Sequence, residues 1–326
     1  MRTGKELLVA SNQFAEEDRF RSWWNVWVTL ALIAGTSVIA CANLPWFVCL
    51  AASLATAILV VRLFIVYHDY EHGAILRNSW LAKVIMNTVG VMLLSPPAIW
   101  KHAHDDHHKN NARKFGPTLG TFPVLSVEQY KELSWVGKLS YLITRHPVII
   151  ATGYFTVFFW ELSLKSFLIE PKRNFFGLVA SGLHVAVIVV LAMFNVQALI
   201  FGWLIPFIVG SAIGSYLFYA QHNFPGMKIR HAPNWDYVQA ALISSSFMKM
   251  NPVMHWLTGN IGYHHVHHLN SKIPFYRLPE AMAAIEELQT PACTSLSPAE
   301  IIRCLRLKLW DPKQDRLVSF SEASAV

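Results

Sequence analysis

The sequence contains little charge for its length. Of its 326 residues, 27 are Lys or Arg and 20 are Asp or Glu, a charged fraction of 14%, whereas 54% are apolar. Soluble domains typically carry about 25% charged residues. A deficit of this size argues against a soluble globular enzyme and indicates an integral membrane protein.

Motifs of several common redox proteins are also missing. The four cysteines form no CxxC pair, which excludes a zinc ribbon and an iron–sulfur loop. No GxGxxG follows a predicted strand, so neither a flavin domain nor a nicotinamide domain is expected. Residues 1–22 lack the short apolar core of a signal peptide. The net charge of +7 does not suggest nucleic-acid binding but suits a face held against anionic headgroups or an acidic partner.

Four long apolar runs stand out against this background, at residues 23–43, 45–67, 176–196 and 198–220. At about 1.5 Å per residue, each run is long enough to cross the hydrocarbon core of a bilayer, about 30 Å thick. A few uncharged residues join the first two runs and the last two. This pattern predicts two transmembrane hairpins, 23–67 and 176–220.

Lysine and arginine indicate how these hairpins are oriented. Apart from Arg62, all of them lie in residues 1–22, 68–175 and 221–326. By the positive-inside rule these three segments are cytosolic. We therefore predict an all-α integral membrane protein with four transmembrane helices, interfacial helices and a cytosolic helical cap at 221–326. The C-terminal sequence lacks an endoplasmic-reticulum retention signal, so we expect the inner membrane of a bacterium.

Two shorter apolar stretches are ambiguous. Residues 80–100 are nearly long enough to span a membrane, but Lys83 and the Ser95-Pro96-Pro97 break weaken that reading, and residues 148–160 are shorter. We predict that both are helices lying along the membrane surface. In the cap, Ser297-Pro298-Ala299-Glu300 resembles a capping box and predicts a helix that continues to about Trp310.

Three histidine clusters carry the strongest chemical signal. They are His68-Asp69-Tyr70-Glu71-His72, His104-Asp105-Asp106-His107-His108 and His264-His265-Val266-His267-His268. Within each cluster, histidines three or four residues apart share one face of a helix. Neutral imidazole is a common ligand for iron, zinc and copper, and three such helix turns could enclose more than one ion. All three clusters lie at the predicted cytosolic edge of the membrane, which favours a metal site there.

The clusters and their positions relative to the apolar runs resemble the membrane-bound fatty acid desaturases, a group of integral-membrane di-iron proteins. The segments from Trp256 to Asn270 and from Ile273 to Tyr276 are especially similar to bacterial and cyanobacterial acyl-lipid desaturases. The resemblance implies a ligand set that includes one histidine just after the last span, in Gln221-His222-Asn223. The implied ligands are His68, His72, His104, His107, His108, His222, His264, His267 and His268, with Asn260 as a further ligand, direct or through water.

Three acids adjoin these ligands. Asp69, Asp105 and Asp106 could hold imidazole rings in orientation, or they could be solvated acids on the opposite helix faces. The remaining histidines His102, His146, His231, His255 and His265 suit surface or structural roles.

Two ionisable residues interrupt the apolar runs. Arg62 could extend its side chain toward the cytosolic edge of the membrane or hold an acyl headgroup, and we expect the former. Ionisable groups within spans are functional by default, but His184 fits none of the clusters. We therefore expect a neutral, hydrogen-bonded His184.

The resemblance also implies a reaction and its partners. Two iron ions would activate dioxygen, and a cis double bond would form in a fatty acyl chain carried by a phospholipid, CoA or a carrier protein. Electrons would come from a ferredoxin or a cytochrome b5, and the basic surface around Lys109, Arg113 and Lys114 could dock such an acidic donor.

Two other functions remain open at the level of sequence. Membrane di-iron hydroxylases and ketolases acting on carotenoids or other lipids share these histidine boxes, and box spacing alone does not separate them from desaturases. A His-rich metal transporter is disfavoured, because transporters place their sites near the bilayer midplane.

Overall fold

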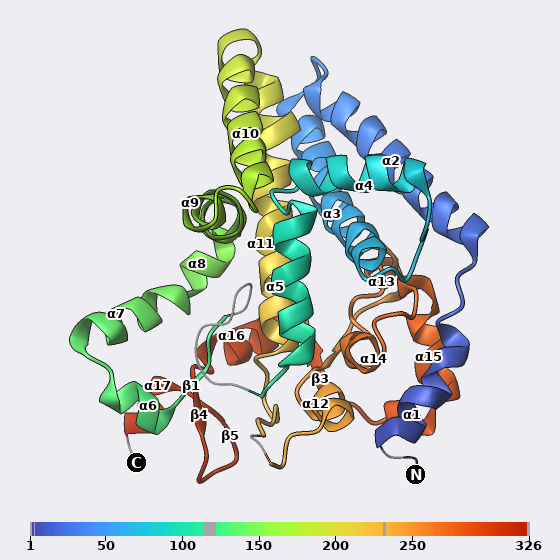
Figure 1. Cartoon of the computed structure of the whole chain (residues 1–326). Helices are drawn as coiled ribbons and strands as arrows, with labels where there is room; N and C mark the ends of the chain where they lie inside the picture. Colours follow the sequence, from blue (N-terminus) through green and yellow to red (C-terminus); the bar gives the residue numbers. More distant parts are fainter. Residues whose placement is uncertain (1, 3, 114–121, 231–232, 325–326) are drawn as a thin grey trace.

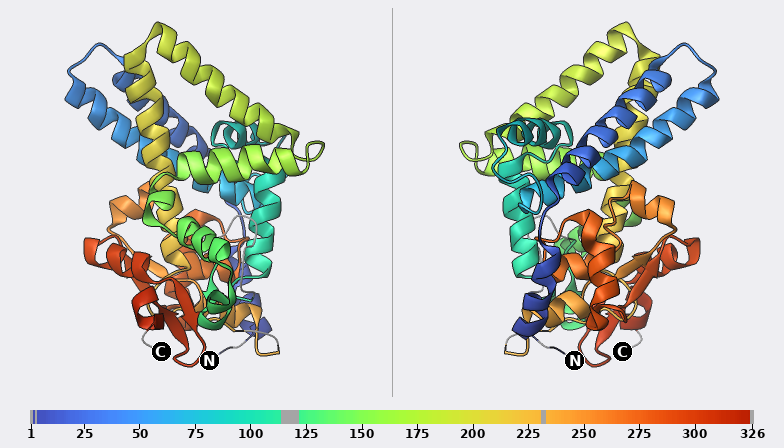
Figure 2. Two further views of the ribbon diagram at one scale, coloured as in Figure 1. Left: turned by 90° about the vertical axis from the view of Figure 1, so that its left-hand side faces the viewer. Right: turned by 90° about the vertical axis from the view of Figure 1, so that its right-hand side faces the viewer.

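The computed structural model describes residue 2 and residues 4–113, 122–230 and 233–324, and most of these are helical (Figure 1). Lys114 and His231 lie outside the described residues. Long helices form one end of the molecule, and short helices and strands form the other, where both chain termini lie (Figure 2). We refer to these two parts as the helical end and the polar end.

Four helices of the helical end are long and apolar enough to cross a membrane. They are α2 (Arg19–Cys41), α3 (Trp46–Glu71), α10 (Phe175–Phe194) and the continuous helix formed by η3 (Ala198–Leu204) and α11 (Ile205–Gln221). The side chain of Asp18 caps α2 by accepting a hydrogen bond from the Arg21 amide, which satisfies one donor of the first turn. The four predicted spans are therefore present as helices.

Helix α3 is the most buried of these helices and lies at their centre. Helix α2 packs along one side of it and α11 along another, whereas α10 contacts η3 and the peripheral helix η2 (Tyr154–Lys165). Helices α10 and α11 meet at the top of the molecule and then diverge (Figure 2). This arrangement places the C-terminal ends of α3 and α11 side by side in the polar end.

The ambiguous stretch 80–100 is not one helix. Helix α4 (Trp80–Met92) lies across the long helices, and α5 (Pro97–Lys109) turns by 84° into the polar end (Figure 1). Pro96 and Pro97 lie at the break, and proline at the start of α5 costs no intrahelical hydrogen bond. If this bent pair formed a single span, the number of candidate spans would rise to five.

The stretch 148–160 is helical but belongs to a longer helical segment. It comprises α8 (Pro147–Ala151), η2, which has the wider π-helical pattern, and α9 (Ser166–Ile169). Before it come α6 (Val127–Glu132) and α7 (Trp135–Thr144), and α7, α8 and η2 form an arm along one side of the molecule (Figure 1).

The segment predicted as a helical cap also contains short strands, as the mostly helical fold allows. Two small sheets connect distant segments: β1 (Leu125–Ser126) pairs with β4 (Leu309–Asp311), which also pairs with β5 (Arg316–Val318), and β2 (Phe247–Lys249) pairs with β3 (Cys293–Ser295). The C-terminal helix α16 (Pro298–Arg306) therefore ends before Trp310, because Leu309–Asp311 is a strand. The partner of β4 in β1 is more than a hundred residues away, so the local sequence gives no sign of this pairing.

The other elements of the polar end are short and connect the histidine-bearing segments. The helices are α1 (Gly4–Ser11), α12 (Tyr237–Ile243), α13 (Pro252–Leu257), α14 (His264–Leu269), α15 (Leu278–Ala284) and α17 (Phe320–Ser324), with single turns η1 (Asn12–Phe14), η4 (Phe275–Arg277) and η5 (Glu286–Leu288). Apolar side chains from most of these elements and from α3 belong to one hydrophobic core, which joins the two ends of the molecule, whereas α17 packs in a second cluster with Val127, Leu309 and Val318.

Arg62 is buried and has partners from both ends of the molecule. Its guanidinium lies between α2, α3 and α13, where it donates to Thr29 Oγ1 at 3.0 Å and to the Trp256 carbonyl. It also lies 3.9 Å from the centre of the Trp256 ring. These protein partners replace water around the guanidinium. Because Trp256 belongs to the segment 221–326, the side chain extends toward the predicted cytosolic cap.

Candidate metal centre

Nine histidines meet where α3, α5, α11 and α14 come together in the polar end. His68 lies in the last turn of α3, and His72 directly follows this helix. Helix α5 contributes three histidines, α14 contributes three, and His222 follows the last residue of α11. The prediction that each histidine cluster is presented by a helix turn is therefore confirmed.

The nine side chains form two groups. In each group, the ring nitrogens available as ligands all lie within 4.8 Å of one another. We call the first the five-histidine group (His68, His72, His104, His108, His267) and the second the four-histidine group (His107, His222, His264, His268). The clusters on α5 and α14 are each divided between the two groups, because successive histidines of one helix turn point in different directions.

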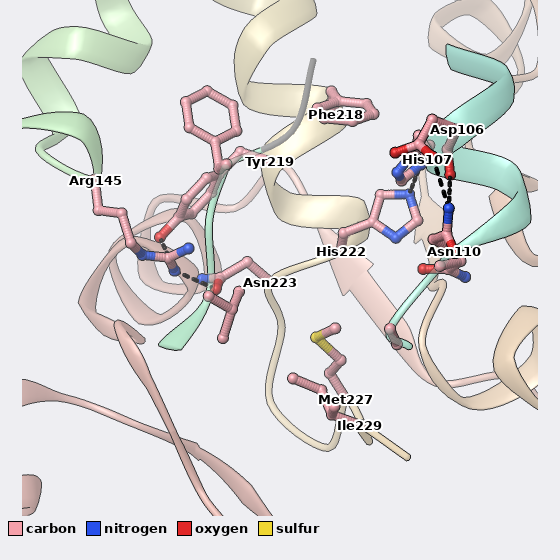
Figure 3. Close-up of a pocket in the computed structure, with 14 residues that line it drawn as sticks. Asp106, His107, Asn110, Arg145, Phe218, Tyr219, His222, Asn223, Met227 and Ile229 are labelled. Atoms are coloured by element: carbon pink, nitrogen blue, oxygen red, sulfur yellow. Dashed lines mark hydrogen bonds between the residues drawn. The ribbon is translucent and has the colours of Figure 1, made fainter. Parts of the chain in front are cut away.

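The contacts within each group have the form expected of ligands that share an ion. In the five-histidine group, Nε2 of His104 lies 3.0 Å from Nε2 of His68 and 3.0 Å from Nε2 of His108. In the four-histidine group, Nε2 of His222 lies 3.0 Å from Nε2 of His107 (Figure 3). It also lies 2.8 Å from Nε2 of His264. A cation at the centre of each group would satisfy several imidazole lone pairs at once. The residues present therefore fit two metal ions.

Two ring tautomers are set by neighbouring groups. Asp69 accepts a hydrogen bond from Nδ1 of His68 at 2.9 Å, and the Ser244 carbonyl accepts one from Nδ1 of His222 at 3.1 Å. Because Nδ1 carries the proton in both rings, Nε2 keeps its lone pair and points into the group. This carboxylate or carbonyl contact behind a histidine is the usual way in which proteins orient a metal ligand.

Burial keeps most of these imidazoles neutral. It lowers the pKa of His222 to about 4. For His104, His108 and His267 burial is again the main cause, and repulsion from neighbouring histidines lowers the pKa further, well below its usual value. Neutral imidazole is the form that binds metal, so few protons have to leave the groups when an ion enters.

Aromatic rings help to hold the two groups in place. The Trp100 ring stacks on His104 with centroids 4.3 Å apart, one helix turn before it on α5. His108 of one group stacks on His268 of the other at 4.2 Å, so the groups are adjacent. Sequence reasoning missed Trp100, although its spacing of four residues from His104 was a usable signal.

The three acids beside the histidines differ in position. Asp69 is buried and contacts His68, and its other carboxylate oxygen accepts from the Phe275 amide at 2.6 Å. Asp105 instead pairs with Lys101 at 3.2 Å at the surface. Asp106 accepts from the Asn110 side chain at 2.7 Å (Figure 3). Among the described contacts of these acids, only those of Asp69 reach a histidine ring.

Asn260 and His265 lie close to the third cluster in sequence but make other contacts. The amide nitrogen of Asn260 donates to the Phe275 carbonyl at 3.1 Å, and its backbone has a positive φ of 53°. Nε2 of His265 bonds to the Leu288 carbonyl at 3.1 Å, in agreement with a structural role. The structure thus ties both residues to neighbouring loops.

Two cavities adjoin the histidines. A large cavity of about 950 Å³ reaches His68, His104 and His264 and is lined mainly by apolar residues of α3, η2 and α11. A small cavity of about 80 Å³ borders His107 and His222, with Asp106, Asn110 and Asn223 among its lining residues (Figure 3). The buried Arg145 lies on its far side, donating to Asn223 Oδ1 at 2.5 Å (Figure 3).

Comparison with known proteins gives one consistent result. The fatty acid desaturase profile matches residues 44–297. A fatty acid desaturase of Bacillus subtilis is 32% identical over 288 residues, covering 85% of this chain and 79% of the relative. Two proteins of Synechocystis, an sn-1 oleoyl-lipid 12-desaturase and an sn-1 acyl-lipid omega-3 desaturase (ferredoxin), are each 25% identical, covering 83% and 82% of this chain and 78% and 76% of the relatives. These matches do not favour a hydroxylase, a ketolase or a metal transporter, and the chain belongs to the fatty acid desaturase family.

Proposed function

We propose that the protein introduces a cis double bond into a fatty acyl chain in a reaction that consumes dioxygen. The observation that carries this proposal is the position of the two histidine groups beside the large apolar cavity. An unactivated methylene offers no acidic proton and no electrophilic carbon, so its oxidation requires a metal centre. An apolar cavity that ends at such a centre suits an alkyl chain.

The proposed ligands are the nine histidines, one ion being held by the five-histidine group and a second by the four-histidine group. When bound, two iron ions would activate dioxygen and supply the oxidising power for removing two hydrogens from adjacent methylenes. In the overall reaction, those hydrogens, two further protons and two electrons from a donor protein reduce dioxygen to two waters.

Residues of the chain hold the histidine rings in orientation and keep water out of the cavity. Asp69 holds the His68 ring, and the Ser244 carbonyl holds His222. Phe64 and Leu217 line the cavity near the histidines and keep this region apolar. For Asn260 we propose a positioning role, because its contact with the Phe275 carbonyl joins the loop before His264 to the backbone that contacts Asp69.

The electron donor that we propose is an acidic ferredoxin or a cytochrome b5. The names of three relatives include ferredoxin, and this chain has a net charge of +7. Lys109 is exposed at the end of α5, and Arg113 nearby stacks over the Trp235 ring at 5.0 Å. Unchanged turnover after charge reversal at both positions would contradict docking at this surface.

We further propose that both termini and the histidine groups face the cytosol, and that the membrane is the inner membrane of a bacterium. The supporting observations are the position of both termini at the polar end (Figure 2) and the absence of Lys and Arg from the links 42–45 and 195–197.

Mass spectrometry of membrane fatty acids tests the proposed reaction. Cells would express the chain with a ferredoxin and its reductase, beside a His268→Ala control. We expect a new double bond that the control lacks. Unchanged acyl chains, with folded and iron-loaded protein, would contradict the desaturase assignment.

A further inference from the structure

Two phenylalanines separate the large cavity from the small one. Of the residues that the structure describes, only Phe122 and Phe218 line both cavities. Phe122 comes from the segment before β1 and Phe218 from α11, and their ring centres lie 6.5 Å apart. We call these two side chains the phenylalanine partition.

The partition follows from the helical period of α11. Leu217 and Gln221 line the large cavity, whereas Tyr219 and His222 line the small one. Successive residues of a helix point about 100° apart, so the last turn of α11 faces both cavities. Phe218 lies between the two faces and belongs to both walls. Its side chain is only half-buried, as expected for a ring with a cavity on each side.

The two cavities reach the four-histidine group through different residues. His264 lines the large cavity, and His107 and His222 line the small one. The Phe218 ring centre lies 5.0 Å from that of His107 and 5.5 Å from that of His222. Both cavities therefore border the same group, and Phe218 packs against its histidines at the boundary between the cavities.

Polar side chains from several elements line the small cavity. Asp106 and Asn110 lie on one side, and Asn223 and Arg145 lie across from them (Figure 3). Arg145 is buried, and its Nε has no hydrogen-bond partner among the described residues. A space of about 80 Å³ accommodates a few water molecules but not an alkyl chain. Because the polar groups come from different elements, no single one of them is needed to hold water there.

The large cavity has a different wall near the histidines. Phe64, Trp100 and Leu217 line it there. The Trp100 ring lies 5.8 Å from that of Phe64 and stacks on His104 at 4.3 Å, so apolar rings extend up to the five-histidine group. This wall suits methylenes and excludes water.

Resting on the proposed function, we propose that the small cavity is the water site of the four-histidine group and that the phenylalanine partition keeps this water away from the acyl chain. The reaction takes up two protons and releases two waters for each double bond, so the histidine groups need contact with water on one side. The acyl chain needs the opposite, because water beside the reacting methylenes permits side reactions. Phe218 acts by excluding water and by packing against His107 and His222.

Loss of the partition should change how donor electrons are used. Coupled turnover uses one dioxygen, two protons and two donor electrons for each double bond, and the two hydrogens of the chain complete the reduction to two waters. When no double bond forms, reduction of one dioxygen to two waters takes four protons and four donor electrons. Entry of water into the large cavity would therefore raise the number of donor electrons consumed per double bond above two.

The first test removes one ring of the partition. Phe218→Ala is compared with Phe207→Ala, which deletes the same atoms from a phenylalanine of α11 that lines the large cavity and not the small one. We expect Phe218→Ala to consume at least twice as many donor electrons per double bond as the wild type. Phe207→Ala should keep the wild-type ratio, whatever its rate. A wild-type ratio for Phe218→Ala, or the same rise for Phe207→Ala, would overturn the proposal.

Phe122→Ala opens the partition from the other side and leaves α11 unaltered. It should raise the same ratio at least twofold. Phe218→Leu keeps a branched apolar side chain and should raise the ratio less than Phe218→Ala does. A rise in Phe218→Ala with none in Phe122→Ala would show a local defect beside the histidines and would count against a partition formed by both rings.

An experiment without metal separates this proposal from the proposed reaction. Metal-depleted protein would be mixed with stearic acids that carry a doxyl spin label at successive carbons and frozen in heavy water. Electron spin echo envelope modulation then detects deuterium close to the label. We expect label positions that are dry in the wild type and in Phe207→Ala to show at least twofold deeper deuterium modulation in Phe218→Ala. Unchanged modulation at every label position overturns this proposal even if the protein is a desaturase, and deeper modulation supports it even if no double bond is formed.

Discussion

The two histidine groups differ in the number of their imidazoles and in the cavities beside them. In the five-histidine group, Asp69 contacts His68, Trp100 stacks on His104, and the Lys272 ammonium donates to the His72 carbonyl. This group borders the large apolar cavity through His68 and His104. The four-histidine group has one imidazole fewer, and His107 and His222 border the small cavity of about 80 Å³, enough for a few water molecules (Figure 3). An ion held by the four-histidine group would therefore have fewer protein ligands and would lie beside a cavity that suits small polar molecules.

Removal of a ligand should have the largest effect and should distinguish the groups. His268→Ala leaves three imidazoles in its group, whereas His267→Ala leaves four in the other. We expect desaturation to fall to background in both variants. Metal analysis of the purified proteins should show a greater loss of iron from His268→Ala.

His265→Ala is the control for these two variants, because His265 contacts the Leu288 carbonyl and belongs to neither group. Equal iron content in His267→Ala and His268→Ala would show that the two groups tolerate the loss of one imidazole equally well.

Asp69→Asn should have the next largest effect, confined to the five-histidine group. The amide cannot accept from Nδ1 of His68 as strongly as the carboxylate does, so the ring loses its fixed tautomer. Loss of a contact of this kind typically lowers metal affinity by about 10- to 100-fold. Competition with a chelator would measure the affinity of each ion, and an equal loss from both groups would contradict the assignment of Asp69 to one of them.

Acid should destabilise the metal-depleted protein. Burial lowers the pKa of His222 to about 4, whereas histidine in an unfolded chain titrates near about 6.5. Between these values the unfolded chain binds more protons than the folded protein does. The contribution of His222 to the free energy of unfolding is therefore fully present above about pH 6.5 and is lost as the pH falls toward about 4. Thermal unfolding from neutral pH downward should show a falling Tm. The decrease in Tm on acidification should be smaller for His222→Gln than for the wild type. An equal decrease would show that other groups cause the pH dependence.

Asp105→Asn and Asp106→Asn should have the smallest effects. Asp105 forms a partly exposed pair with Lys101, and pairs of this kind contribute about 0.2–1 kcal/mol. Asp106 borders the small cavity beside the four-histidine group but contacts Asn110. We expect iron content unchanged in both variants and turnover within about twofold of wild type. A large loss of turnover for Asp106→Asn, but not for Asp105→Asn, would indicate that the small cavity takes part in the reaction.

The sequence was sufficient to predict the long helices and the histidines that gather. Four apolar runs predicted four helices, and the spacing within α5 and α14 predicted histidines on shared helix faces. These features depend on local periodicity, which a single sequence displays directly.

The division of the histidines and the environment of Arg62 depend on tertiary contacts. His107 and His108 are neighbours in sequence but belong to different groups, because the other members of each group come from distant helices. The partners of Arg62, Thr29 and Trp256, come from other helices and are not revealed by its local sequence. The helix end at Arg306 was missed for the same reason, because the segment that follows pairs with the distant strand β1.

The contacts of Arg62 have a consequence for how the protein is made. Asn25 and Thr29 precede Arg62 in the chain and are available as soon as α3 forms. Trp256 follows it by 194 residues, which at about 5–20 residues per second takes about 10–40 s to synthesise. During this interval Asn25 and Thr29 are the only two of these three hydrogen-bond partners available to the guanidinium. Substitution of Asn25 or Thr29 should therefore reduce the yield of inserted protein more than it reduces the stability of the finished molecule.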